Sequence, residues 1–311
     1  MLEKLSTLPT KKDAADSSDS RSIIMNSKNY SVTISATELL RNLQNPDWVI
    51  VDCRFSLADP DWGETEYQAL HIPGAVYAHL DRDLAGPKTP ETGRHPLPSD
   101  EKTIQVFSVL GIDSSKQVIV YDATSGSFAA RLWFMLNLYG HRRVAVLDGG
   151  FAYWHMQGYP IESGINHNSP VQFTGSYHPE MVVTTPQMEQ LIHDKDWRII
   201  DARAHERYAG ESEPIDPVAG HIPGALNRFH ELNLDRNGLF KPDESLKEEF
   251  IPLLDPQHLD NTVVYCGSGV TSCHHLIAMR LAGLPLPKLY VGSWSEWIRD
   301  PSRPIKQNKE P

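Results

Sequence analysis

The sequence predicts an α/β protein made of two tandem domains, each a mostly parallel sheet flanked by helices. Its 311 residues exceed one ordinary domain of about 100 to 150 residues. Within each half, short apolar runs alternate with longer helical patterns such as residues 128–138. Strands buried on both faces read as near-continuous apolar runs, as VIVY at 118–121 and TVVY at 262–265 do. This alternation predicts parallel strands joined by helices.

The second half of the chain repeats the first. Four blocks match in the same order, which chance similarity would not preserve. The matching pairs are WVIVDCRF (48–55) with WRIIDARA (197–204), HIPGA (71–75) with HIPGA (221–225), VIVYDATSG (118–126) with TVVYCGSGV (262–270), and VAVLDGGFAYW (144–154) with KLYVGSWSEW (288–297). The sequence therefore encodes one α/β module twice.

The repeat also suggests the domain boundaries. Residues 162–181 are polar and contain Gly and Pro, as expected of a linker. Residues 1–28 lack the continuous apolar segment of a secretory signal, and we expect a disordered tail there. The expected domains are residues 29–161 and 182–305, followed by a short C-terminal tail at 306–311.

Composition excludes several classes of function. With 29 basic and 40 acidic residues, the net charge of −11 argues against binding to nucleic acid or to an anionic membrane. No apolar run of about 18 residues occurs, so no transmembrane span is expected. Three cysteines form neither a disulfide framework nor a zinc-type pair, and the histidines show no metal-ligand pattern. We therefore expect no metal, and reduced thiols in the cytoplasm.

Comparison of the two copies separates structural residues from candidate functional ones. Asp52 with Arg54 and Asp201 with Arg203 occur at matching positions, as do both HIPG turns, so we expect them to serve the fold. The third block differs. Where the first copy has Asp122 after its strand, the second has a cysteine, and chemistry present in one copy alone is a candidate for function.

Cys266 directly follows the strand TVVY and opens the loop CGSGVT, which leads into a helical pattern. Gly267 and Gly269 allow a tight curl in which successive N–H groups face the sulfur. With the positive end of the next helix, they should lower the pKa of the thiol below its free value of about 8.5. The alternative is a buried core cysteine. That structural role is the one expected of Cys53 and Cys273, with a resolving thiol as the alternative for Cys273.

Taken together, these motifs resemble the tandem-domain rhodaneses over residues 30–305. The shared features are a HIPGA turn in each copy, a first copy without the cysteine, CGSGVT in the second, and GSWSEW near the end. The loop is similar to that of 3-mercaptopyruvate sulfurtransferases, whereas thiosulfate sulfurtransferases usually carry basic side chains there. The resemblance implies that Gly267, Ser268, Gly269, Val270 and Thr271 surround the donor beside the cysteine.

The resemblance also implies a proton relay that includes a serine of this loop and two residues of the first domain. The matching residues are Ser268, His95 in GRHPLP, and Asp81, although Asp83 is an alternative to Asp81. Cleavage of a C–S bond leaves an enolate that must be protonated, and a hydroxyl linked to a histidine can deliver that proton.

The family's carboxylate-binding arginine matches Arg207 in HERYAG. A planar guanidinium suits this task because it binds a carboxylate with two parallel hydrogen bonds. Members of the family often have a second arginine shortly before the second HIPG. Here Ile215 stands at that place, so carboxylate binding is expected to be weaker, or another residue substitutes.

These observations favour a sulfurtransferase that carries sulfur as a persulfide on Cys266. The expected donor is 3-mercaptopyruvate, which releases pyruvate, and the expected acceptor is cyanide or a thiol such as thioredoxin or a small thiol. No cofactor is expected. Thiosulfate is the alternative donor, although the loop itself carries no cation for this dianion. A non-catalytic sulfide- or partner-binding module is a remote alternative, and a cysteine phosphatase would need an arginine where Ser272 stands.

Overall fold

Two five-stranded parallel sheets form the core of the computed structural model, which describes residues 29–124 and 126–308. The strand order is β1-β5-β4-β2-β3 in the first domain and β6-β10-β9-β7-β8 in the second. The predicted fold class is confirmed. The strands are β1 (Thr33–Ile34), β2 (Trp48–Asp52), β3 (Val76–Tyr77), β4 (Gln117–Tyr121), β5 (Val144–Leu147), β6 (Val182–Val183), β7 (Arg198–Asp201), β8 (Leu226–Asn227), β9 (Thr262–Tyr265) and β10 (Lys288–Tyr290).

The sequence repeat falls on equivalent elements of the two sheets. The first matching block forms β2 and β7, and the third forms β4 and β9, which are their neighbours in the sheets. Asp52 pairs with Tyr121 in one sheet and Asp201 with Tyr265 in the other, so the two central strand pairs also share their register.

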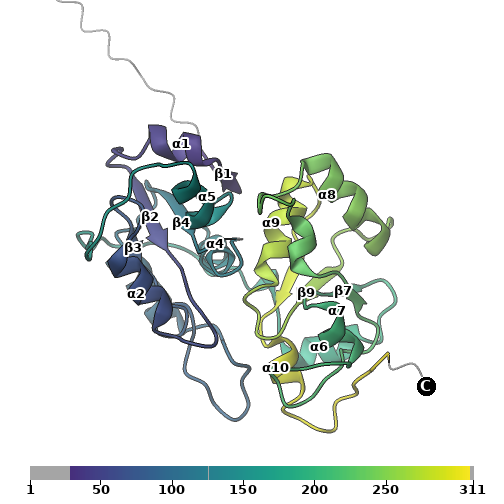
Figure 1. Ribbon diagram of the computed structural model, residues 1–311. Helices are drawn as coiled ribbons and strands as arrows, with labels where there is room; N and C mark the ends of the chain where they lie inside the picture. The colour runs from purple at the N-terminus through teal and green to yellow at the C-terminus, as the bar shows by residue number, and fades with distance from the viewer. Residues whose placement is uncertain (1–28, 125, 309–311) are drawn as a thin grey trace, which may run out of the picture.

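Helices cover the faces of each sheet, as Figure 1 shows. Ser35 and Ser99 cap two helices of the first domain by accepting a hydrogen bond from a backbone N–H in the first turn. The α-helices are α1 (Ala36–Arg41), α2 (Trp62–Ala69), α3 (Asp100–Val109), α4 (Ala129–Leu138), α5 (Gly150–Met156), α6 (Thr185–Leu191), α7 (His205–Ala209), α8 (Asp243–Phe250), α9 (Cys273–Leu281) and α10 (Ser293–Trp297). Short 3₁₀ helices lie at Pro179–Met181, His230–Asn233 and Ile251–Leu253.

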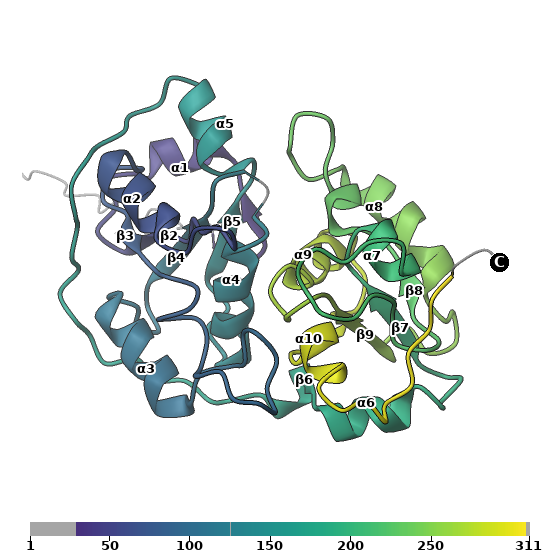
Figure 2. The same cartoon turned by 60° about the horizontal axis from the view of Figure 1, so that its bottom comes forward.

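The two domains meet along α4 and α9, which face each other at the centre of Figure 2. All ten residues of α4 are buried, and α9 is buried from Cys273 to Met279. One apolar cluster runs through this interface and contains side chains of both sheets, such as Val120 and Val264. Two smaller apolar clusters cover the outer faces of the sheets, one in each domain, so the interdomain cluster is the largest part of the core.

The residues repeated in both copies hold each sheet to its HIPG turn. Arg54 forms a buried ion pair with Asp52, and Arg203 forms one with Asp201. Each arginine also donates a 2.6 Å hydrogen bond to the carbonyl oxygen that precedes the histidine of the HIPG turn. The predicted structural role of these pairs is confirmed.

The segment between the domains packs against the first domain. Glu162 pairs with His71, and Phe173 is buried against Phe107. The chain after α5 runs down the outer side of this domain before it reaches β6 (Figure 2). Lys306 forms an antiparallel backbone bridge with His221 in the second domain, so part of the expected C-terminal tail belongs to that domain. The expected disordered tail, residues 1–28, lies outside the described residues.

Helices long and apolar enough to cross a membrane do not occur among residues 29–124 and 126–308.

Candidate active site

Cys266 lies directly after β9, at the carboxyl edge of the second sheet, where parallel α/β folds bind ligands. Its backbone N–H donates to the hydroxyl oxygen of Ser293, and its carbonyl oxygen accepts from the N–H of Trp294. The N–H of Ser295 donates to the carbonyl oxygen of Gly267. The start of α10 therefore holds the beginning of the cysteine loop through three hydrogen bonds.

The two loop glycines are needed for different reasons. Gly269 has a φ of +72°, and a Cβ there would lie 2.3 Å from the carbonyl oxygen of Val291. Gly267 has no such backbone angle, but a Cβ there would lie 2.7 Å from Nη2 of Arg94 and 3.4 Å from Nη2 of Arg207. Gly269 thus allows the turn, and Gly267 leaves room for two guanidinium groups.

The surroundings of Cys266 favour the thiolate. Burial of the sulfur raises its pKa, but the hydroxyl groups of Ser272 and Thr271 and the N–H groups of Ser268 and Ser272 outweigh it, so the pKa is lowered overall. The Ser272 hydroxyl is buried and otherwise has no hydrogen-bond partner among the residues that the structure describes. Cys266 is therefore the candidate nucleophile, a buried thiol whose surroundings stabilise its anion.

A chain of polar contacts runs from Ser268 into the first domain. Nδ1 of His95 lies 2.8 Å from Oγ of Ser268, and Nε2 lies 3.1 Å from Oδ1 of Asp81. Asp83 points elsewhere, since it accepts a hydrogen bond from the N–H of His79. The structure thus brings together the three residues matched by resemblance, in the order Asp81, His95, Ser268.

His95 is neutral at neutral pH in this environment. Burial lowers the pKa of its imidazole to about 3, and Arg131, Lys88 and Arg94 add to the effect through their positive charges. Oδ1 of Asp81 lies 3.1 Å from Nε2 without hydrogen-bond geometry, and its negative charge favours the proton on that nitrogen. Nδ1 is then left to accept a hydrogen bond from the Ser268 hydroxyl.

Arg131 of α4 is a residue of this site that the sequence reasoning missed. It is fully buried and donates to the carbonyl oxygens of Gly269 (2.9 Å), His95 (3.1 Å) and Leu84 (3.3 Å). One side chain of the inactive copy therefore fixes both the cysteine loop and the segment that carries His95. A single charged residue in the otherwise apolar stretch AARLWFML was the available signal.

Arg94 is the second missed residue, and it accompanies the predicted Arg207. The loop itself carries no cation, but the guanidinium groups of Arg94 and Arg207 both lie beside Gly267. Both arginines pair with the carboxylate of Asp216. Arg207 also pairs with Glu213, 2.8 Å away. The position of Arg94, next to His95 in the sequence, was the available signal.

Three sequence expectations find different outcomes. Val270 is 2% exposed and its side chain packs in the interdomain cluster, and its place beside the donor stays a prediction. Thr271 contributes through its hydroxyl to the low pKa of Cys266. Cys53 and Cys273 are buried, and burial raises the pKa of both thiols, to about 12 for Cys273, in agreement with their expected structural roles.

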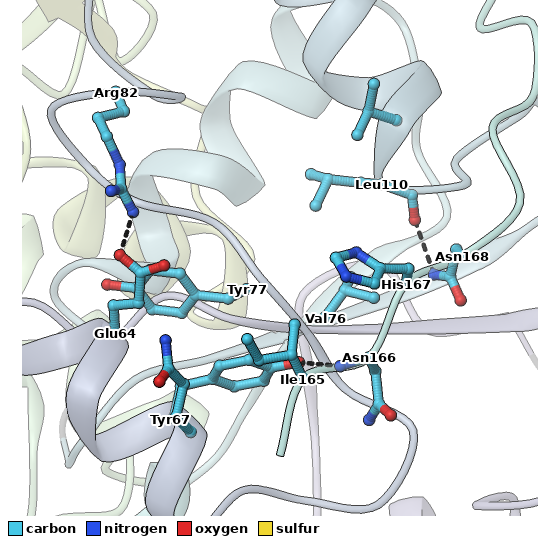
Figure 3. Close-up of a pocket in the computed structure, with 12 residues that line it drawn as sticks. Glu64, Tyr67, Val76, Tyr77, Arg82, Leu110, Ile165, Asn166, His167 and Asn168 are labelled. Atoms are coloured by element: carbon cyan, nitrogen blue, oxygen red, sulfur yellow. Dashed lines mark hydrogen bonds and ion pairs between the residues drawn. The ribbon is translucent and has the colours of Figure 1, made fainter.

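Another cavity, drawn in Figure 3, lies in the first domain and has a volume of about 180 Å³. Several of its polar side chains are already paired: Arg82 pairs with Glu64, and Asn168 donates to the carbonyl oxygen of Leu110. No residue of the cysteine loop lines it. We therefore place the candidate active site at Cys266, between the domains.

Known proteins share this architecture. A model described as "Rhodanese-like domain" matches the chain twice, over residues 35–157 and 184–300. The chain is 44% identical to the "Probable 3-mercaptopyruvate sulfurtransferase" of Pseudomonas aeruginosa, with 88% of this chain and 96% of the relative covered. It is 33% identical to "Thiosulfate/3-mercaptopyruvate sulfurtransferase 2" of Arabidopsis thaliana, with 88% and 85% covered.

A solved structure agrees with these relatives. The crystal structure of SseA from Escherichia coli, described as a 3-mercaptopyruvate sulfotransferase, superposes with a TM-score of 0.74 at 32% identity. The match covers 86% of this chain and all of that one. The chain is therefore a sulfurtransferase that belongs to the rhodanese-like family and contains two copies of its domain.

Proposed function

We propose that this sulfurtransferase takes sulfur from 3-mercaptopyruvate, holds it as a persulfide on Cys266, and passes it to a thiol or to cyanide. The observation that carries the proposal is the polar chain Asp81, His95, Ser268, which ends in the loop of a cysteine with a lowered pKa. A thiosulfate enzyme would need no such chain, because sulfite leaves without a proton being added to carbon. The names of the P. aeruginosa and E. coli proteins support the same donor.

In the first step, the Cys266 thiolate attacks the donor sulfur. An S–S bond forms, the C–S bond breaks, and its electron pair passes to the enolate of pyruvate. The proton of the donor thiol ends on the enolate carbon. The thiolate and mercaptopyruvate thus become an ionised persulfide and pyruvate, with atoms and charge balanced.

Ser268 is the group proposed to move that proton. A hydroxyl can accept one proton while giving up another, so His95 need not hold a charge, in keeping with its low pKa. His95 then serves to orient the hydroxyl through Nδ1, and Asp81 orients the imidazole.

Arg94 and Arg207 are proposed to bind the donor's carboxylate. Their guanidinium groups lie beside Gly267, next to the nucleophile, and Arg94 supplies the cation that Ile215 does not. Ile215 itself is 43% exposed and takes no part. We expect Arg207→Ala to raise KM more than it lowers kcat, because the carboxylate is bound in both ground and transition states.

In the second step, an acceptor thiolate or cyanide attacks the outer sulfur and restores the Cys266 thiolate. Thioredoxin and small thiols are the proposed acceptors, and the cytoplasm, where cysteines stay reduced, is the proposed location. This chemistry uses the side chains described above and a thiol or cyanide, without a bound cofactor.

Thiosulfate is the second candidate donor. The two guanidinium groups beside the loop favour an anionic donor, whether it carries one negative charge or two. The name of the A. thaliana relative includes both thiosulfate and 3-mercaptopyruvate.

Steady-state kinetics with both donors and a common acceptor tests the proposal. We expect kcat/KM for mercaptopyruvate to exceed that for thiosulfate by at least about tenfold, equivalent to about 1.4 kcal/mol of transition-state preference. Ser268→Ala should then slow the mercaptopyruvate reaction more than the thiosulfate reaction. A faster reaction with thiosulfate would contradict the donor assignment, and the absence of any persulfide would support a non-catalytic module.

A further inference from the structure

The carboxylate of Asp216 lies between Arg94 and Arg207, the two arginines of the donor site, and has no role in the mechanism above. One oxygen of Asp216 pairs with Nη1 of Arg94, and the other lies 3.2 Å from Nη2 of Arg207. The Asp216 side chain is only 3% exposed, although the adjacent Ile215 is 43% exposed. The segment before the second HIPG therefore turns a carboxylate, rather than residue 215, toward the arginines.

These ion pairs continue as a cluster whose charges cancel. Glu213 pairs with both Arg207 and Arg203, and Arg203 pairs in turn with Asp201. Three guanidinium groups thus face three carboxylates. An anionic sulfur donor therefore binds to a cluster with no net charge, in which Asp216 already neutralises part of the positive charge of the arginines.

Arg94 nevertheless has one N–H group that could bind a ligand. Its Nε is buried and has no hydrogen-bond partner among the described residues. An N–H group in this state is costly unless something accepts from it. The donor carboxylate could therefore bind Arg94 while Asp216 remains on the other side of the guanidinium group.

We propose that Asp216 is an internal counter-ion of the donor site and that its charge selects donors with a single negative charge over dianions. The inference rests on the proposed binding of the donor at Arg94 and Arg207. Repulsion from Asp216 grows in proportion to the charge of the bound donor. Mercaptopyruvate carries one charge on its carboxylate, whereas thiosulfate carries two, so thiosulfate is penalised twice as strongly in free energy.

Asp216→Asn removes this charge with little change of shape. We expect kcat/KM to rise about threefold for mercaptopyruvate and about tenfold for thiosulfate, so that the preference between them falls about threefold. Asp216→Ser, a second neutral substitution, should act in the same direction. Asp216→Glu should keep the wild-type preference because it keeps the charge. Glu211→Gln, the same charge change at an exposed residue of the same segment, should leave both donors unaffected.

The kinetic result overturns the proposal if the neutral variants change kcat/KM for both donors by the same factor. A uniform loss would mean that Asp216 only supports the fold of the segment. A uniform gain would mean that its charge opposes donors without selecting among them.

A binding experiment separates this inference from the proposed function, because it needs no sulfur transfer. Pyruvate and sulfate, one monoanion and one dianion, are titrated into Cys266→Ser and into Cys266→Ser with Asp216→Asn. Sulfate should gain more affinity than pyruvate from loss of the charge. This gain without turnover of mercaptopyruvate would leave the inference standing and refute the proposed function. Normal turnover of mercaptopyruvate with an equal gain in affinity for both anions would support the proposed function and refute the inference about Asp216.

Discussion

The loops after β4 and β9 are the same structure used in two ways. In the first domain, the carboxylate of Asp122 accepts hydrogen bonds at 2.7 to 3.2 Å from four backbone N–H groups among the described residues of its own loop and the start of α4. In the second domain, N–H groups and hydroxyls surround the sulfur of Cys266 and lower its pKa. Burial still raises the pKa of Asp122 despite these hydrogen bonds, whereas the pKa of Cys266 is lowered overall. Both loops thus direct N–H groups at a buried acidic group, and the residue at the centre decides whether that group is structural or reactive.

The segments that cross between the domains also differ. The segment around His95 brings a histidine and a nearby aspartate to the Cys266 loop. On the other side, the segment around Phe240 brings a backbone N–H, which donates to Asp148 at 2.9 Å, and the apolar side chain of Leu239, which lies near Gly149. We therefore propose that activity requires a nucleophile in one copy and polar side chains supplied by the other.

The largest expected effect follows from giving the second loop the residue of the first. Cys266→Asp should fold, because the loop can stabilise a carboxylate, but it should transfer no sulfur. Cys266→Ser should be equally inactive, since a hydroxyl cannot store transferable sulfur. Mass spectrometry after donor treatment should find one added sulfur on the peptide that contains Cys266 in the wild type and none in either variant.

Cys53→Ser and Cys273→Ser are the matched controls, because both thiols are buried and have raised pKa values. Both variants should keep most of the activity. Residual turnover of more than a few per cent in Cys266→Ser, or added sulfur on Cys273, would reverse these roles.

Arg131→Met tests the contribution of the inactive domain. The substitution leaves three buried carbonyl oxygens without their charged donor, so we expect a loss of about 2 to 4 kcal/mol in the free energy of unfolding. Displacement of Ser268 and His95 should lower kcat/KM by at least about tenfold in the folded protein. Urea denaturation and steady-state kinetics measure the two effects.

Arg142→Met, at an exposed arginine that donates one hydrogen bond to Asn137 of the same helix, should lower the free energy of unfolding by no more than about 1 kcal/mol and leave kcat/KM unchanged. Arg131→Lys keeps the charge but cannot reach three acceptors, so it should lie between wild type and Arg131→Met. Wild-type kinetics in Arg131→Met would show that the second domain positions its loop without the first.

Asp122→Ala should affect stability alone. Four N–H groups lose their acceptor, and we expect the free energy of unfolding to fall by about 2 to 4 kcal/mol. Asp122→Asn, which keeps one acceptor oxygen, should lose about half as much. If kcat/KM falls in proportion to stability while the protein is fully folded, the first loop has a catalytic role that the comparison denies.

The smallest expected effect concerns pH. Burial raises the pKa of Asp148 to about 6, and Asp235 adds to the shift through its negative charge. A raised pKa favours the protonated form in the folded state, so this contribution is present below about pH 4 and is lost as pH rises through about 6. Asp148→Asn should therefore stabilise the protein by about 1 to 2 kcal/mol above pH 6 and give no gain near pH 4.

Thermal unfolding at a series of pH values checks this prediction. The asparagine keeps an oxygen that can accept from the Phe240 N–H, so the interdomain contact remains. Equal stabilisation at all pH values would mean that ionisation of Asp148 is not the cause.

The sequence by itself determined the architecture and the position of the candidate nucleophile. Apolar runs and the ordered repeat predicted two parallel sheets, because buried strands appear as short apolar segments and their alternation with helices indicates parallel pairing. The same repeat separated Asp52 and Arg54, which hold the fold, from Cys266, which differs from its counterpart Asp122. The relay residues Asp81, His95 and Ser268 were found by resemblance, and the structure adds their mutual distances.

Only the tertiary structure decided how charges meet around the cysteine. Arg131 and Gly269 are 138 residues apart in the chain, and Arg94 and Asp216 are 122 apart. No local pattern records such contacts, because they arise only when α4 packs against α9 and closes the two domains on each other. For the same reason, Gly267 could be predicted to matter, but not that its missing side chain makes room for two arginines.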